Sequence, residues 1–145
     1  TTIEKLLKKF KKDIEKFRAQ TVERLKDELV KRVKLMNGVQ VVRAVIEMEP
    51  SAAKDLVFKI REALPENLLC VIGSKAHEKP MLSVMLSDDM VSEHGLNAGQ
   101  IIRQAAKLIQ GGGGGQPHYA SAGGKDLDGI SVAVDKAVEL AGLFL

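Results

Sequence analysis

Five consecutive glycines, residues 111–115, are the segment of this 145-residue chain that is most informative about its chemistry. Fixing so many glycines costs much conformational entropy, so a folded domain keeps them where backbone must approach something closely or adopt unusual conformations. A flexible linker is the alternative. The run lacks the serines and the length of a linker, however, and it lies between two helical patterns. We therefore expect an ordered loop whose N–H groups face an anionic or backbone-rich partner.

Polar and basic side chains lie close to this run in the sequence. Arg103 and Lys107 are one helical turn apart before it, and they can point to the same side. For each cation alone, an ordinary solvated surface charge is the alternative. Their joint placement predicts a concave surface lined by backbone and edged by Gln116, His118, Lys125, Arg103 and Lys107, with Lys75 and Lys79 from a polar connection as further candidates.

The glycine run does not match the common nucleotide-binding motifs. A Walker A loop that ends at Gly124-Lys125 needs a glycine where Tyr119 stands. A dinucleotide-binding fingerprint starting in the run fails because its last glycine falls on Gln116 or Pro117. We therefore do not expect this loop to bind a nucleotide cofactor.

The histidines and the cysteine suggest no catalytic or metal centre. His77, His94 and His118 lie in three separate connections and form no cluster with metal-ligand spacing. Cys70 lies in an apolar run, where we expect a buried strand residue rather than an activated thiol. A lone cysteine forms no internal disulfide, which fits a reducing compartment. The sequence predicts no catalytic residue and no metal site.

Charge is distributed unevenly along the chain. Residues 1–34 carry 12 Lys/Arg against 6 Asp/Glu, and residues 35–145 carry 10 against 13, so the net +3 is the sum of +6 and −3. The basic segment would attract polyanions such as nucleic acid, or is simply a solvated surface. Aromatic residues make up only 3%, which argues against a module that stacks bases on several exposed rings. No apolar run reaches bilayer-spanning length, so we expect a soluble, non-exported protein without a membrane partner.

The first 37 residues are predicted to form a helical arm. Apolar residues recur at spacings of four and three, as in a coiled coil, and no glycine or proline precedes Gly38. We expect Asn37-Gly38 to end the helix. One long helix packed on its own domain is the alternative to an arm that pairs with another helix. The predicted oligomerisation residues are Ile3, Leu7, Phe10, Ile14 and Phe17.

Residues 38–145 are predicted to form a small globular domain. The patterns indicate a strand over 39–48, a helix over 51–64 capped by Ser51, and an antiparallel pair of strands over 68–73 and 81–86. A loop over 88–95, a helix capped by Asn97, the glycine loop and a final helix capped by Asp126 follow. The fold class is therefore α/β (α+β), in the order β-α-β-β-α-α, with helices packed on one face of a mixed sheet.

Residues 94–126 carry a family resemblance. The stretch 94–99, the helical residues 101–109, the glycines, Pro117, residues 120–124 and Lys125-Asp126 resemble the C-terminal domain of alanyl-tRNA synthetases, a DHHA1-like domain. The rest of the chain agrees in architecture, including the arm. The same glycine signature occurs in the substrate-binding domain of DHH-type phosphoesterases and single-strand exonucleases, typically as G-G-G-H, where this chain has Gln116.

The resemblance implies a function in tRNA docking. The domain would hold the outer corner of tRNA(Ala) in cooperation with the aminoacylation and editing domains of the same cytoplasmic enzyme, and the arm would form a homodimer. The N–H groups of Gly112, Gly113, Gly114 and Gly115 would approach the RNA backbone. ATP, magnesium and zinc would belong to other parts of the enzyme, so this fragment would hold no cofactor.

The chain departs from the family pattern just after the glycines. Gln116 stands where arginine is frequent, which removes a guanidinium suited to bidentate phosphate contact. Tyr119 would compensate by stacking on a base. Two other hypotheses stay open: a substrate domain of a phosphoesterase, and a purely structural dimerisation module whose glycine loop packs only against protein.

Overall fold

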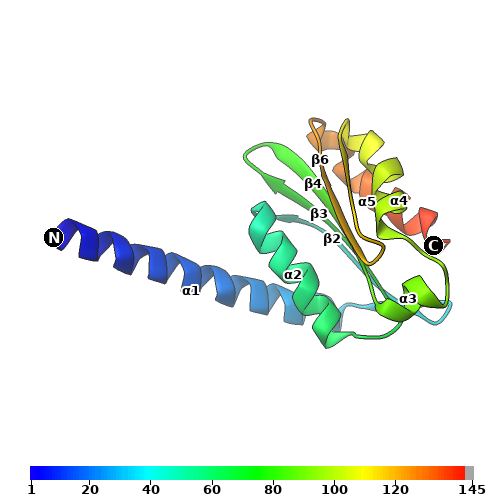
Figure 1. The fold of residues 1–145 in the computed structure, drawn as a ribbon, viewed down its shortest axis with the longest axis horizontal. Coiled ribbons are helices and arrows are strands. Elements are labelled where there is room, and N and C mark those ends of the chain that lie inside the picture. Colours follow the sequence, from blue (N-terminus) through cyan, green and yellow to red (C-terminus); the bar gives the residue numbers. More distant parts are fainter. Residues whose placement is uncertain (143–145) are drawn as a thin grey trace.

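The computed structural model describes residues 1–142, and the last three residues of the predicted domain 38–145 lie outside the described part. A long helix, α1 (Thr2–Lys31), extends away from a sheet that is flanked by helices (Figure 1). Thr1 caps this helix through a reciprocal pair of hydrogen bonds with Glu4. Within α1 the buried residues are Val22 and Leu29, so the helix packs on the domain through its second half.

The helix is shorter than predicted, because Asn37-Gly38 is a hairpin turn rather than a helix end. α1 stops at Lys31, and the chain then forms β1 (Lys34–Met36), which pairs antiparallel with β2 (Val39–Glu47). Asn37 and Gly38 have φ of 53° and 82°. Two successive residues with positive φ suit the tight turn whose twist matches that of a hairpin.

Six strands form one sheet in the order β1-β2-β3-β4-β6-β5. The bounds of the elements not yet given are α2 (Pro50–Ala63), β3 (Leu68–Ala76), β4 (Lys79–Leu86), β5 (Gly112–Gly115) and β6 (Tyr119–Gly123). β2 and β3 are parallel across α2, and the other neighbours are antiparallel. The predicted mixed sheet and the predicted β3–β4 hairpin are confirmed.

Helices cover both faces of the sheet, so the prediction that they cover one face is wrong. α4 (Ala98–Ala105) and α5 (Ile130–Leu140) pack on the face that contains Leu69 and Val71. α2 and the second half of α1 pack on the opposite face, with Leu68, Cys70 and Ile72. Alternate residues of β3 thus enter two different cores. A continuous apolar run such as 68–72 is the pattern expected of a strand that is covered on both sides.

The connections between these elements differ from the prediction in part. Glu49, not Ser51, occupies the N-cap position of α2, because Pro50 begins the helix. A short helix, α3 (Asp88–Ser92), occupies part of the segment predicted as a loop. Asn97 caps α4 as predicted, through a hydrogen bond from the Gln100 N–H. A 3₁₀ turn, η1 (Ala106–Ile109), extends α4. Asp126 caps a second one, η2 (Leu127–Gly129), that leads into α5.

The glycine run is an edge strand, not the predicted loop, and its alternate glycines are required by close packing on β6. A Cβ built at Gly111, Gly113 or Gly115 would overlap a carbonyl oxygen of β6. At Gly112 nothing lies within 4 Å of such an atom, and at Gly114 its neighbour is Arg103 Nε at 3.9 Å. Three of the five glycines therefore allow β5 and β6 to approach each other, and the other two leave open space.

Two valine substitutions on neighbouring glycines test this packing. Gly113→Val should lower the free energy of unfolding by about 1–3 kcal/mol, because the new side chain collides with β6 backbone. Gly112→Val should change it by no more than about 0.5 kcal/mol, because the space there is open. Urea unfolding followed by far-UV circular dichroism measures both, and equal losses in the two variants would contradict the packing argument.

The thiol of Cys70 should be inert in the folded protein. Cys70 is fully buried in β3 between the two helical layers, and burial raises the pKa of its thiol far above the usual range. We expect no reaction with Ellman's reagent at pH 8 in buffer and reaction of one thiol per chain in strong denaturant. Rapid reaction without denaturant would show that the β3 packing described here is wrong.

Candidate functional site

The edge strand β5 presents backbone rather than side chains on the outside of the sheet. Its register with β6 pairs Gly112 with Gly123 and Gly115 with Ala120, and the Gln116 N–H donates to the Tyr119 carbonyl at 2.8 Å. Because hydrogen-bonded and non-hydrogen-bonded pairs alternate, Gly113 and Gly115 turn their N–H groups away from β6. Both residues are exposed, so these two donors lie on the open edge.

The helical side of this edge is partly closed. The Gly111 N–H donates to the Ala106 carbonyl at 3.0 Å, and a Cβ on Gly99 at the start of α4 would lie 3.3 Å from the Gly115 carbonyl oxygen. α4 and η1 thus run alongside β5 and fix its two ends. The predicted row of free glycine N–H groups is therefore shorter in the structure than in the sequence-based hypothesis.

Basic side chains flank this edge at both ends. Arg103 on α4 is exposed and lies next to Gly114, and Lys107 follows it by one turn on η1. Lys125 is exposed beyond the end of β6, and its backbone N–H donates to the Ile109 carbonyl at 2.8 Å. We call Gly112–Gly115 together with Arg103, Lys107 and Lys125 the β5 surface. Long-range attraction of an anion is the chemistry that this arrangement favours.

Lys75 does not belong to the β5 surface. It lies near the end of β3, where Gly73, two residues earlier, faces Ile130 and Val134 of α5. Since alternate residues of a strand share a face, Lys75 is on the α5 side. Lys79, which pairs with Ala76 on the neighbouring strand, lines a pocket with Gly112 and Lys125 instead.

The turn between β5 and β6 is tied down by backbone contacts. The Pro117 carbonyl accepts from the Ala98 N–H and the His118 carbonyl from the Leu86 N–H, both at 2.8 Å. Gln116 is exposed at this turn and His118 is half-buried. The turn is therefore held against both α4 and β4.

Tyr119 lies on the α2 side of the sheet. Its ring centroid is 5.1 Å from that of Phe58, and Lys54 Nζ lies 5.9 Å from it. Such a tilted aromatic pair with a neighbouring cation stabilises the packing of α2 on β6. The structure thus gives the Tyr119 ring partners inside the domain and separates it from the β5 surface.

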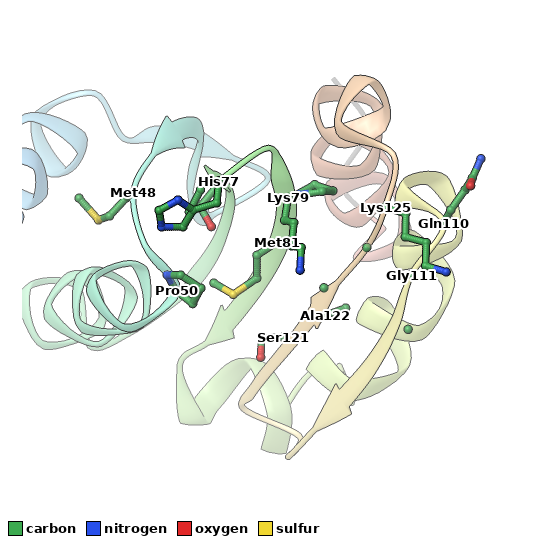
Figure 2. A pocket seen from close by; sticks show the side chains of 16 residues that line it. Met48, Pro50, His77, Lys79, Met81, Gln110, Gly111, Ser121, Ala122 and Lys125 are labelled. Atoms are coloured by element: carbon green, nitrogen blue, oxygen red, sulfur yellow. The ribbon is translucent and has the colours of Figure 1, made fainter.

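A pocket of about 880 Å³ lies beside Gly111 and Gly112, at the start of the glycine strand. No spacing in the sequence predicts it. Figure 2 shows Met81 and Ser121 between Pro50 on one side and Gly111 with Lys125 on the other. Its residues come from α2, β3, β4, β5, β6 and the connections next to them, so the pocket arises from long-range packing. Of its lining, the hypothesis from sequence had named Lys79, Lys125 and the glycines.

The described residues contain no metal-ligand cluster. No group of three or more His, Cys, Asp or Glu side chains within residues 1–142 is arranged to hold a metal ion. His77 lies 3.7 Å from Glu49 on the surface. Within the same residues, no helix has the length and apolar character needed to cross a bilayer.

Comparison with known proteins identifies the family. The DHHA1 domain model matches residues 37–142. An alanine–tRNA ligase from Bacteroides fragilis is 46% identical over 133 residues, which is 92% of this chain and 15% of that protein. The chain therefore spans about one seventh of the length of this relative, and the activity of the whole protein does not transfer with the match.

Solved structures agree with this assignment. The C-Ala domain of alanyl-tRNA synthetase from Aquifex aeolicus superposes with a TM-score of 0.66 at 26% identity, covering 75% of this chain and 96% of that one. RecJ from Thermus thermophilus shares the fold alone, with a TM-score of 0.55 at 16% identity over 88% of this chain and 18% of that protein. The resemblance seen in residues 94–126 is confirmed, and the chain belongs to the DHHA1 domain family, as a counterpart of the C-Ala domain of alanyl-tRNA synthetases.

Proposed function

We propose that this chain is the tRNA-binding domain of an alanine–tRNA ligase and that it holds the outer corner of tRNA(Ala). The observation that carries the proposal is the 46% identity to such a ligase across 92% of the chain. The aminoacylation and editing domains of the same polypeptide would then act on a tRNA that this domain positions. ATP, magnesium and zinc would bind in those other parts, in the cytoplasm.

The β5 surface supplies a physical mechanism for docking. A strand without side chains lets the sugar–phosphate backbone approach main-chain donors, and Gly113 and Gly115 are exposed on the open edge. Main-chain N–H groups bond phosphate oxygens or 2′-hydroxyls and position the RNA without reading its sequence. Arg103, Lys107 and Lys125 add attraction at both ends of the strand. Gln116 contributes amide donors but no charge.

The arm supports a second part of the proposal, a homodimer. Ile3, Leu7, Phe10, Ile14 and Phe17 are 56–72% exposed, although each is apolar and together they follow a heptad repeat. Such a seam is stabilised when a second helix covers it. We propose that the occupant is the same seam of a second copy of this chain.

The two rival hypotheses differ from this one in what they bind. A substrate domain of a DHH-type phosphoesterase has the support of the RecJ fold, which at 16% identity concerns fold alone. A purely structural module would dimerise without binding RNA. The names of the relatives favour the ligase, and the RNA experiment below separates it from the structural module.

Binding to a tRNA(Ala) transcript should weaken steeply with salt. If Arg103, Lys107 and Lys125 each neutralise one phosphate, log Kd should rise by about 2–3 for each tenfold increase in salt. Arg103→Glu should weaken binding about tenfold or more and lower that slope by about one.

The matched control for this experiment is Lys34→Glu. It makes the same kind of charge change on β1, at the opposite edge of the sheet, and should change Kd less than about twofold. Fluorescence anisotropy between 50 and 300 mM salt measures all three proteins. Absence of binding at micromolar protein, or binding insensitive to salt, would overturn the docking proposal.

Dimerisation should depend on the arm seam. Phe10→Asp or Ile14→Asp places a charge in the seam and should convert the dimer to monomer in sedimentation velocity at micromolar concentration, without loss of helicity in the domain. Lys12→Asp, on the opposite side of the helix from the seam, is the control and should leave the dimer intact. A chain that is monomeric at every concentration would rule out pairing through the arm.

A further inference from the structure

The pocket beside β5 has features that the packing of the domain does not explain. It is formed by the α2 side of the sheet where α2 does not cover it, with Ser74, Met81 and Ser121 on its floor. Met48, Pro50 and His77 form one wall, and Gly111 and Lys125 lie on the opposite side (Figure 2). Its volume of about 880 Å³ is in the range of small-molecule sites.

Two glycines keep this pocket open although the fold does not need them. Gly112 and Gly123 are cross-strand partners and both line the pocket. Neither has a positive φ, and an added Cβ would have nothing within 4 Å at either position. Side chains there would be compatible with the strand pairing and would occupy the open space. The absence of side chains at Gly112 and Gly123 is therefore better explained by space kept for a ligand than by the packing of the sheet.

The floor of the pocket carries two serine residues, and a third serine behind it has a hydroxyl that is unpaired within residues 1–142. Ser74 is buried and Ser121 is half-buried, and both line the pocket. Ser83, two residues from Met81 on the same face of β4, is outside the pocket lining, and its buried hydroxyl has no hydrogen-bond partner within the described residues. Unpaired buried hydroxyls carry a desolvation cost. Ser74 and Ser121 line the pocket, so their hydroxyls can bond the polar edge of a ligand that enters it.

The charge of the pocket favours an anion attached to a flat apolar body. Its lining includes Lys79, Lys125 and His77 and, among residues 1–142, no carboxylate, while Glu49 lies outside the lining and 3.7 Å from His77. Methionine side chains adapt to rings and contact them through a polarisable sulfur, and Met81 lies in the middle of this space (Figure 2). The Met81 side chain, the two serines and the cationic rim together match a nucleobase with its phosphate.

We propose that this pocket, the Met81 pocket, receives one unstacked nucleotide of the bound RNA. The base lies against Met81 and the Gly112–Gly123 pair, with its polar edge toward Ser74 and Ser121, and the flanking phosphates lie near Lys79 and Lys125. Single-stranded RNA nucleotides are recognised in this way, by packing of the base and by hydrogen bonds to its edge. The inference rests on the proposed tRNA docking and adds to it a contact with a base.

Methionine methyl resonances report on this pocket directly. With ¹³C-methyl methionine, addition of the tRNA(Ala) transcript should shift the signal of Met81, which lines the pocket. Met85 and Met90 are buried in the two cores and serve as internal controls that should not shift. Heparin, a polyanion without bases, should leave the Met81 signal in place. Equal responses to heparin and tRNA would overturn the assignment of a base.

Filling the pocket should weaken tRNA binding without unfolding the domain. Gly123→Leu should raise Kd about tenfold or more, whereas Ala63→Leu, an exposed position at the far end of α2, should change it less than about twofold. Lys79→Glu is a second variant that adds no bulk to the sheet and should also raise Kd at least tenfold.

The outcomes separate this inference from the docking proposal. If Arg103→Glu weakens binding while Gly123→Leu and Lys79→Glu leave Kd unchanged, the Met81 pocket is not occupied and the inference fails alone. If the unmodified chain binds no tRNA, both fail together. Weakening by the pocket variants, with a shift of the Met81 signal, supports the inference.

Discussion

The close approach of β5 to β6 is the constraint on which the binding surface depends. A strand of ordinary residues cannot occupy this position, because a Cβ at Gly111, Gly113 or Gly115 would overlap the β6 backbone. Glycine at these three positions costs conformational entropy on folding, and the sheet regains stability by adding two strands beyond β4. The result is a sheet edge that presents main-chain donors with cations around it, a surface on which shape and charge rather than side-chain hydrogen bonds would determine binding.

The two faces of the sheet are covered by helices to different extents. α4 and α5 cover one face and bury Leu82, Val84 and Ala122 there. The same layer contacts both ends of the glycine run, because Gly99 lies close to Gly115 and the Ala106 carbonyl accepts from the Gly111 N–H. On the other face α2 leaves the region around Met81 and Ser121 open. α1 continues from the α2 side, so the arm and the Met81 pocket belong to the same side of the molecule. The face covered by α4 and α5 thus supports the face that is open around Met81 and Ser121.

Much of this fold follows from local patterns, and the errors have identifiable causes. The apolar run 68–72 and the Asn97 cap predicted a buried strand and a helix start at the observed places. The sequence does not predict β5, because a strand of glycines has no hydrophobic alternation. Asn37-Gly38 predicts a helix end, but this pair also favours the hairpin turn that the structure contains. The composition of the site depends on which face of its strand each residue occupies and on long-range packing. Lys75 and Lys79, for example, are four residues apart but lie on opposite faces of the sheet, because the β3–β4 turn separates them. No spacing in the sequence indicates that Ser74, Met81 and Ser121 would share a pocket.

The central claim is that main-chain groups of β5 contact the RNA. Amide hydrogen exchange at Gly113 and Gly115, followed by NMR in the presence and absence of a tRNA(Ala) transcript, tests it most directly. If the strand edge is the docking surface, exchange at these two amides slows strongly on binding, while exposed amides of β1 at the opposite edge exchange as before. Unchanged exchange at both glycines under conditions where the tRNA is fully bound would contradict the account.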